Sequence, residues 1–417
     1  MNNRQQQPDH DGHPSLVGTQ FEAQIGKVAH GGHCVTRYDG QVVFVRHALP
    51  GETVRVRITD GKVGDRFMLG DAIAVLEASE HRVVPRCRFA GPGNCGGCDW
   101  QHSDLTYQRE LKAAVVAEQF QRLAGIEVAV VVKALPGDQE GFRWRTRTEF
   151  AIDGSGAAGL RRHRSHEIIP VDDCLISTGR VIATGVLDRP WPGAASVDVV
   201  DASGEPCALT VPLPQRSSTV QYVTERVAAG DWSGEFRLSA RGFWQVHPAA
   251  AATFVAHVLH ELEPKPGERA TDLYAGVGLF ALALADAVGP TGAVLAIESD
   301  ARAFRDAKAN LRARPEIELR RGKVDRMLKP LVRQGIHSGL VVLDPPRTGA
   351  GKTVMKDIAA LRPRAIAYVA CDPAALARDV AYARNAGYGI RSLRAFDAFP
   401  MTHHVECIAI LEPSRDR

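Results

Sequence analysis

The stretch Arg269–Phe280, RATDLYAGVGLF, decides the fold of the C-terminal half of the chain. Its first residues are typical of a buried strand, and the run FALALADAV at 280–288 is typical of a helix that follows directly. Gly276 and Gly278 stand at the turn between them, where glycine lets a ligand approach the backbone closely. Several nucleotide-binding folds share such a turn, so it predicts only a nucleotide-like ligand.

Further strands and helices alternate around this stretch, from Arg241 to the end of the chain. Apolar runs at 293–299, 339–344 and 365–371 read as buried parallel strands, and ARAFRDAKANLRA at 301–313 reads as a helix between two of them. This alternation predicts a doubly wound, Rossmann-like α/β domain. Glu298 ends the second strand and could accept hydrogen bonds from both ribose hydroxyls of a nucleotide. A helix-capping carboxylate is the alternative interpretation of Glu298.

The strand GLVVLDPPR, residues 339–347, narrows the class of ligand. Asp344 stands at its carboxyl end, where open α/β sheets bind ligands, and the two prolines fix an extended turn. Methyltransferases that act on nucleobases carry Asp/Asn-Pro-Pro at this point, and dehydrogenases generally do not. The motif therefore favours S-adenosylmethionine over NAD, although a chance Pro-Pro turn is the alternative.

The next strand, AIAYVA, leads into Cys371 and then a helical stretch. A cysteine just before a helix lies near the positive helix N-terminus, which favours the nucleophilic thiolate. Adding a thiolate to carbon 6 of uracil makes carbon 5 nucleophilic enough to take a methyl group, and a base must then remove the proton from carbon 5. Glu406, in the apolar strand HHVECIAIL, is the candidate base, with a salt-bridged glutamate as the alternative and His403 and His404 as rivals.

The N-terminal half divides into two β-rich parts. Runs such as QVVFVRHA and TVRVRI, separated by Gly and Pro turns, predict a small barrel with interleaved basic residues over residues 15–79, after a disordered tail over residues 1–14. Asp104 could cap a helix that ends near Gly125. A mixed β-rich domain is expected over residues 80–240, and the methyltransferase-like domain over residues 241–417. Arg143, Arg145 and Arg147, with the RRHR run at 161–164, predict a phosphate-contacting surface, or simply one wet face of a sheet.

Composition narrows the classes of protein to which the chain could belong. Hydrophobic residues make up 45% and charged residues 24% of the chain, which favours a globular protein over a disordered one. There is no membrane-length apolar run and no secretory signal, so we expect a cytoplasmic protein. A formal net charge of only +3 excludes no nucleic-acid partner, because a local basic face suffices. No obligate protein partner is evident. Among eight cysteines, three cluster at Cys87, Cys95 and Cys98, which favours a metal or catalytic use over disulfides.

Taken together, the motifs FWQVH, DLYAGVGLF, LDPPR, ACDPAALARD and MTHHVECIAIL resemble the RNA 5-methyluridine methyltransferases. The stretch at 26–54 looks like a TRAM domain, an OB-like RNA-binding module. The resemblance implies an S-adenosylmethionine-dependent enzyme that methylates a uridine of rRNA or tRNA, with Cys371 as nucleophile and Glu406 as proton acceptor. A base inside a stem must be flipped out to reach Cys371, so we expect a uridine in a loop. It also implies contacts to S-adenosylmethionine from Gln245, Tyr274, Glu298 and Asp344.

The cysteine cluster resembles the iron–sulfur motif of the TRAM-containing branch of that family. By this resemblance Cys87, Cys95, Cys98 and the distant Cys174 hold a [4Fe–4S] cluster, although four thiolates also suit zinc. The first spacing has seven intervening residues where five is usual. The four cysteines could also be unligated.

Two residues depart from the family pattern. Leu279 replaces a common asparagine after the cofactor turn, and Asp372 replaces the usual asparagine after the nucleophile. Two rival functions stay open. An amino-methylating enzyme would use Asp344-Pro-Pro without any thiol, and a non-catalytic RNA-binding protein would transfer no methyl group at all.

Overall fold

The computed structural model describes residues 14–138, 140–204, 207–211 and 220–414. The tail predicted over residues 1–14 lies, apart from Pro14, outside the described residues. Four sheets make up the described part of the chain: a barrel-like sheet, a central sheet, a two-stranded hairpin and a large C-terminal sheet. The fold class predicted from the sequence is confirmed.

The N-terminal sheet has five strands in the order β1-β4-β5-β3-β2. Its strands are β1 Gln20–Gln24, β2 Cys34–Tyr38, β3 Gln41–Arg46, β4 Thr53–Asp60 and β5 Met68–Glu77. In β4 the apolar residues Val54, Val56 and Ile58 are buried, while Arg55 and Arg57 between them are exposed. This period of two gives the barrel an apolar interior and a charged outer face.

The central sheet has the order β11-β10-β7-β8-β9. It consists of β7 Arg147–Ile152, β8 Ala158–Arg161, β9 Ile168–Pro170, β10 Ser196–Val200 and β11 Ala208–Thr210, with the short helix α2 Gly179–Ile182. The hairpin β12 Tyr222–Ala229 and β13 Trp232–Ser239 follows. Val223 and Phe236 of this hairpin belong to the core of the C-terminal part, so its packing favours a domain boundary nearer residue 220 than residue 240.

The C-terminal sheet has eight strands in the order β16-β15-β14-β17-β18-β20-β19-β6. They are β14 Arg269–Leu273, β15 Ala293–Glu298, β16 Ile317–Arg321, β17 Leu340–Leu343, β18 Ala365–Ala370, β19 Tyr388–Asp397, β20 Glu406–Pro413 and β6 Val132–Ala134. The pairs β15–β14, β14–β17 and β17–β18 are parallel, as predicted, and β20 is antiparallel to β18.

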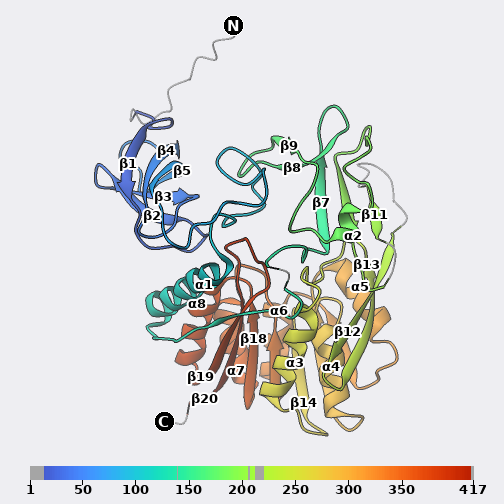
Figure 1. Ribbon diagram of the computed structural model, residues 1–417. Helices are drawn as coiled ribbons and strands as arrows, with labels where there is room; N and C mark the ends of the chain where they lie inside the picture. The colour runs from blue at the N-terminus through green and yellow to red at the C-terminus, as the bar shows by residue number, and fades with distance from the viewer. Residues whose placement is uncertain (1–13, 139, 205–206, 212–219, 415–417) are drawn as a thin grey trace.

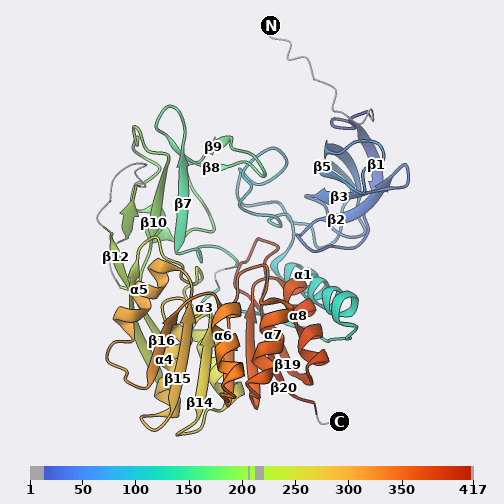
Figure 2. The ribbon, with the colours of Figure 1, turned by 180° about the vertical axis from the view of Figure 1, so that it is seen from behind.

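Helices cover both faces of this sheet. One face carries α3 Ala250–Leu262, α4 Leu279–Val288 and α5 Ala301–Asn310. The other carries α6 Val324–Arg333, α7 Gly351–Ala360 and α8 Pro373–Asn385. The barrel and the central sheet both lie beyond one edge of the large sheet, and the loop between β19 and β20 extends toward them (Figures 1 and 2). That edge holds the carboxyl ends of the parallel strands, because Ala370 at the end of β18 pairs with Cys407 at the start of β20.

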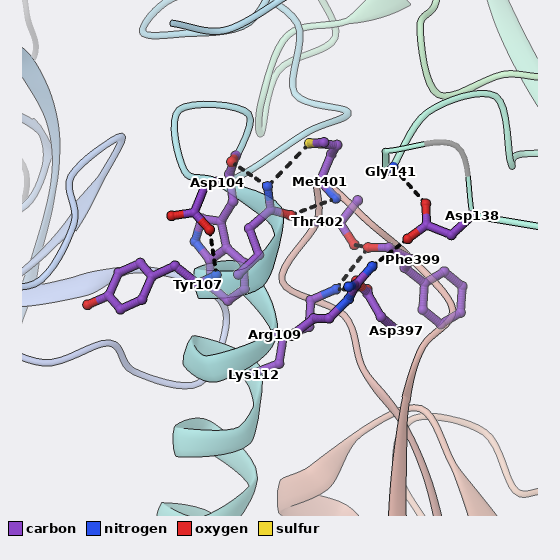
Figure 3. Close-up of polar contacts among 12 residues, drawn as sticks. Asp104, Tyr107, Arg109, Lys112, Asp138, Gly141, Asp397, Phe399, Met401 and Thr402 are labelled. Atoms are coloured by element: carbon purple, nitrogen blue, oxygen red, sulfur yellow. Dashed lines mark hydrogen bonds and ion pairs between the residues drawn. The ribbon is translucent and has the colours of Figure 1, made fainter. Parts of the chain in front are cut away.

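Helix α1, Leu105–Gln119, links the barrel region to the C-terminal sheet, and a single π-helical turn, η1 Phe120–Ala124, continues it. Asp104 caps α1 by accepting a hydrogen bond from the Tyr107 backbone N–H, as predicted. The buried Lys112 ammonium donates to Asp397 Oδ1 at 2.5 Å and to the Phe399 carbonyl at 3.0 Å (Figure 3). This contact fixes the β19–β20 loop, which leads directly into Glu406.

Candidate active site

Four of the predicted site residues lie along one edge of the C-terminal sheet. Tyr274 follows β14, Asp344 follows β17, Cys371 follows β18, and Glu406 is the first residue of β20. Strands β14, β17 and β18 are neighbours and run parallel, and β20 runs antiparallel to β18. The carboxyl ends of the first three strands and the start of β20 therefore meet at the same rim. The structure thus brings Tyr274, Asp344, Cys371 and Glu406 to one rim of the sheet.

The turn after β14 has the geometry that close approach of a ligand requires. Tyr274, Gly276 and Gly278 have positive φ angles of 62°, 57° and 97°, and such an angle is uncommon for a tyrosine. A Cβ atom built on Gly276 would meet no atom within 4 Å, whereas one on Gly278 would stand 3.0 Å from Leu311. Gly278 therefore serves packing as well as the turn, and the open space at Gly276 fits a bound molecule.

Glu298 holds this turn from the neighbouring strand. Its Oε2 accepts a hydrogen bond from the Gly276 N–H at 2.8 Å, and its Oε1 accepts one from the Asp300 N–H at 2.6 Å. The helix cap itself is Asp300, whose side chain accepts from Arg302 and Ala303, so Glu298 is not the cap. A carboxylate has about four acceptor positions, and two remain for ribose hydroxyls.

Asp272 is a candidate that the sequence analysis did not single out. It lies inside β14 and is 1% exposed, and its Oδ2 is a buried acceptor without a hydrogen-bond partner among the described residues. Burial raises the pKa of its carboxyl well above the usual value, and Asp344 and Glu298 raise it further. An unpartnered buried acceptor beside the turn fits a cationic or hydrogen-bond-donating group of a ligand. The sequence did contain a signal for this candidate, because Asp272 is a charged residue within a strand that is otherwise largely apolar.

Leu279, the departure at the start of α4, is buried and offers no polar group to the turn. The turn has another polar support, because Asn310 Nδ2 at the end of α5 donates to the Val277 carbonyl at 3.1 Å. Asn310, from a distant segment, therefore contacts the backbone two residues before position 279, where the family often has an asparagine.

Asp344 and Glu406 form a pair of carboxyl groups at the rim. The carboxyl group of Asp344 is surrounded by protein atoms, and this burial raises its pKa to about 7. The rest of the residue keeps some exposed surface. Glu406 is 2% exposed, and burial together with the neighbouring Asp344 raises its pKa well above the usual range. Two nearby carboxyl groups with raised pKa values are typical of sites that move protons.

The strand register places Cys371 next to Glu406. Ala370 pairs with Cys407 in the antiparallel ladder, so the next pair in that register is Cys371 with Glu406. Side chains of directly opposed residues have Cβ atoms about 5 Å apart on the same face of a sheet. The thiol and the carboxyl group are therefore neighbours at the edge where Asp344 also lies.

The thiol of Cys371 does not have the low pKa that the sequence analysis expected. Burial raises the pKa of Cys371 to about 12, and Glu406 and Asp344 raise it as well, while Arg347 lowers it. The start of α8 still lies beside the thiol, but three carboxyl groups within reach, including Asp372, oppose its effect. The expectation of a thiolate favoured by the helix N-terminus was therefore wrong for the protein without ligands.

A cavity of about 160 Å³ opens onto Cys371. Its walls include Arg347, His403 and His404, and also His30 to Gly32 from the barrel. The rival bases have other partners: His403 Nδ1 is 2.7 Å from Asp99 Oδ2, and Arg347 lies 3.3 Å from His404 Nε2. Burial lowers the pKa of His404 to about 3, which leaves it a weak base.

Gln245 lies in a different cavity. It is buried, and it lines a space of about 400 Å³ together with Thr178, Asp201 and Glu225 rather than Tyr274 or Asp344. The predicted contact of Gln245 with S-adenosylmethionine stays a prediction.

The four predicted metal-ligating cysteines do come together. Cys87, Cys95, Cys98 and Cys174 line one cavity, and three of their pKa values respond to the charge of the others. Within the described ranges, however, no group of three or more His, Cys, Asp or Glu residues is arranged to hold a metal ion. The [4Fe–4S] cluster at these cysteines therefore stays a prediction, as does zinc.

Part of the predicted phosphate-contacting surface is wrong. Arg147 forms a largely buried ion pair with Glu225 at 2.7 Å, and Arg143 donates to both carboxylate oxygens of Asp173 at 2.9 and 2.7 Å. Arg143 also lies outside β7, with a positive φ of 57°, so these arginines do not follow one another along a single strand. In the run at 161–164, Arg161 and Arg164 stay exposed.

Comparison with known proteins decides the family. The profile of the tRNA (Uracil-5-)-methyltransferase family matches residues 216–414, and the profile of the TRAM domain matches residues 14–67. A protein of Streptomyces avermitilis named an uncharacterized RNA methyltransferase is 48% identical over 95% of this chain and 99% of its own length. A protein of Bifidobacterium longum with the same name is 37% identical over 95% of this chain and 98% of its own length.

The chain belongs to the tRNA (uracil-5-)-methyltransferase family. It is an RNA methyltransferase, as the sequence predicted. A solved structure with the same fold is the Pyrococcus abyssi tRNA (uracil-54, C5)-methyltransferase in complex with S-adenosyl-L-homocysteine. It has a TM-score of 0.67 and 21% identity, and the match covers 94% of this chain and all of that chain. No helix in the described part of the chain is long and apolar enough to cross a bilayer.

Proposed function

We propose that this methyltransferase transfers a methyl group to carbon 5 of a uridine in a loop of rRNA or tRNA, through a covalent bond between Cys371 and carbon 6. The observation that carries the proposal is that Glu406 and Asp344 lie close enough to Cys371 to raise the pKa of its thiol, at the strand ends that the Ala370–Cys407 pair brings together. A thiol and a buried carboxyl group side by side match a reaction that needs a nucleophile and a base.

The reaction uses these two side chains in sequence. The Cys371 thiol gives its proton to solvent and its sulfur bonds to carbon 6, so the electron pair of the ring double bond makes carbon 5 an enolate carbon. Carbon 5 takes the methyl group as the bond between that methyl and the sulfonium sulfur breaks, and the electron pair of that bond stays on the sulfonium sulfur. Glu406 as carboxylate then removes the proton that carbon 5 still carries. The electron pair of that C–H bond restores the ring double bond and expels the sulfur of Cys371.

S-adenosylmethionine supplies the methyl group from its sulfonium. Glu298 is placed to accept hydrogen bonds from its ribose, and the open space at Gly276 lets it lie against the turn. Asp272 and Asp344 present buried carboxyl groups near the same turn, and carboxylates stabilise a nearby cation. Tyr274 and Gln245 complete the set of proposed contacts.

The RNA partner follows from the shape of the site. The cavity at Cys371 has about 160 Å³, which fits one base and not a stacked duplex, so the target uridine must leave its stack. A loop uridine does this at less cost than a paired one. We also propose the TRAM-like barrel over residues 15–79, followed by the central domain from residue 80. The methyltransferase domain then includes the hairpin that starts at Tyr222, so it begins near residue 220 rather than at residue 241. We propose that the protein acts in the cytoplasm.

The four cysteines are proposed to hold a [4Fe–4S] cluster with a structural or RNA-shaping role. The support is their common cavity and the softness of four thiolate donors. Iron and acid-labile sulfide in anaerobically purified protein would support this, and stoichiometric zinc without sulfide would contradict it.

Mass spectrometry of nucleosides tests the function. RNA from cells lacking the gene is incubated with the enzyme and S-adenosylmethionine, and the new nucleoside is identified. We expect 5-methyluridine with the native enzyme and none with Cys371→Ala. An N-methylated base, or unchanged activity of Cys371→Ala, would refute the proposal.

A further inference from the structure

The N-terminal barrel supplies one wall of the cavity that contains Cys371. The turn before β2 contributes His30, Gly31 and Gly32, while the opposite wall comes from residues of the methyltransferase part such as Arg347 and His404. The barrel and the reacting thiol therefore line the same cavity. A module that only bound RNA at a distance from the thiol would not contribute to this cavity.

One polar contact joins the two parts directly beside the thiol. His30 Nε2 lies 3.0 Å from Asp372 Oδ2, and the two residues are 342 positions apart in the sequence. The other oxygen of the same carboxylate, Oδ1, accepts a hydrogen bond from the Ala375 N–H at 2.7 Å and caps α8. Asp372 thus connects the barrel to the start of α8, and Cys371 is the residue before it.

The turn that carries His30 is firmly seated. The Gly32 carbonyl accepts a hydrogen bond from Trp100 Nε1 at 2.9 Å, and Trp100 is 1% exposed. Gly32 has a positive φ of 80°, and a Cβ atom there would stand 2.4 Å from Cβ of His403. Because the backbone of the turn packs this closely, His30 has a defined position relative to Asp372.

Asp372 departs from the asparagine that the family usually carries, and it brings a negative charge to the contact. The hydrogen bond that His30 donates to the Asp372 carboxylate raises the pKa of His30 above its ordinary value, although burial acts in the opposite direction. Besides Asp372, the ionisable groups that line the cavity with His30 are Cys371, Arg347, His403 and His404. A protonated His30 and an ionised Asp372 form an ion pair, and a neutral His30 keeps only a weaker hydrogen bond.

We propose that His30 of the barrel is a positioning residue, which acts through Asp372 to hold the start of α8 and the Cys371 thiol in their reactive arrangement. The inference rests on the proposed function of Cys371 as the nucleophile. It assigns the barrel a part in the reaction step in addition to RNA binding.

The test compares kcat and KM of the native enzyme and His30→Ala on RNA from cells lacking the gene. We expect kcat to fall about tenfold at pH 6, where His30 is protonated, because a half-exposed ion pair in such a place has a moderate effect. The defect should shrink between pH 6 and pH 9 as the pH rises through the pKa of His30, because the neutral imidazole keeps only the weaker hydrogen bond. His30→Asn, which can still donate a hydrogen bond, should recover part of kcat.

Two matched variants separate positioning from simple docking of the barrel. Lys27→Ala removes the barrel's ion pair with Glu118 of α1, which has an N–O distance of 2.6 Å, and leaves Asp372 untouched. It should change kcat by less than twofold. In an Asp372→Asn background, the loss of kcat caused by His30→Ala should no longer depend on pH, because the charge on residue 372 is gone.

Three results would overturn the inference: an unchanged kcat in His30→Ala, a defect equal at pH 6 and pH 9, or an equal loss of kcat in Lys27→Ala. Activity measurements on Cys371→Ala distinguish an error in the positioning role of His30 from an error in the proposed function. If Cys371→Ala is inactive while His30→Ala resembles the native enzyme, only the positioning role is wrong. If Cys371→Ala is active, the nucleophile itself is wrong.

Discussion

The reactivity of Cys371 should rise steeply with pH across the whole range in which the protein is folded. Burial, Glu406 and Asp344 raise the pKa of this thiol from its ordinary 9.0 to about 12. Three pH units correspond to about a thousandfold less thiolate at any pH well below both values. A thiolate of higher pKa is also the stronger nucleophile, which returns roughly a factor of twenty over three units.

The net expectation is a reaction with a neutral disulfide reagent about fiftyfold slower than that of the same cysteine in the unfolded chain at pH 8. Peptide mass spectrometry follows Cys371 separately from the other seven cysteines. Poor access to the cavity would lower the rate equally at every pH. The raised pKa would instead give about a tenfold increase per pH unit between pH 7 and pH 10.

Two perturbations identify the cause of the slow reaction. Glu406→Gln removes a carboxyl group that raises the pKa of the thiol, so it should speed the reaction at fixed pH. S-adenosylmethionine should speed it more than S-adenosylhomocysteine does, because the two share their shape and only the first carries a sulfonium charge. A rate that levels off near pH 7 in the free enzyme would refute this reasoning and show that the helix N-terminus dominates after all.

Three further predictions concern other parts of the molecule. Glu298→Gln should weaken S-adenosylmethionine binding about tenfold or more in calorimetry, since an amide nitrogen cannot accept the Gly276 hydrogen bond; an unchanged Kd would contradict the ribose site. Lys112→Met should lower the stability by about 3 kcal/mol by leaving Asp397 buried with fewer partners, and Lys112→Met/Asp397→Leu should regain part of it; equal unfolding midpoints would contradict this. Cys98→Ala should abolish iron binding, and an unchanged iron content would exclude Cys98 as a ligand.

The sequence was sufficient for the fold and for much of the site because both follow from local patterns. Apolar runs of strand length alternate with helical runs, so the parallel strands β14, β15, β17 and β18 lie where they were predicted. Residues that follow such strands must meet at one edge, and this rule alone brings Asp344 and Cys371 together. Asp104 is a further local signal, because a cap is defined by the few residues after it.

The remaining features depend on contacts between distant segments, which no local pattern reports. The pKa of Cys371 depends on carboxyl groups that reach it only through the sheet. Arg147 was expected to face a phosphate, but Glu225 from the hairpin takes its charge. The pairing of His30 with Asp372 joins residues from opposite ends of the chain. Each of these contacts is set by tertiary packing rather than by spacing in the sequence.

The central claim is a covalent bond between Cys371 and the pyrimidine, and RNA made with 5-fluorouridine tests it most directly. In 5-fluorouridine, fluorine replaces the hydrogen on carbon 5, so the base has no proton to remove there. The adduct should therefore persist once the methyl group has been transferred. Digestion and mass spectrometry should then find a nucleotide on the peptide that contains Cys371. With ordinary uridine, Glu406→Gln should accumulate the same linkage because its base is missing. A linkage at another residue, or its formation by Cys371→Ala, would contradict the account.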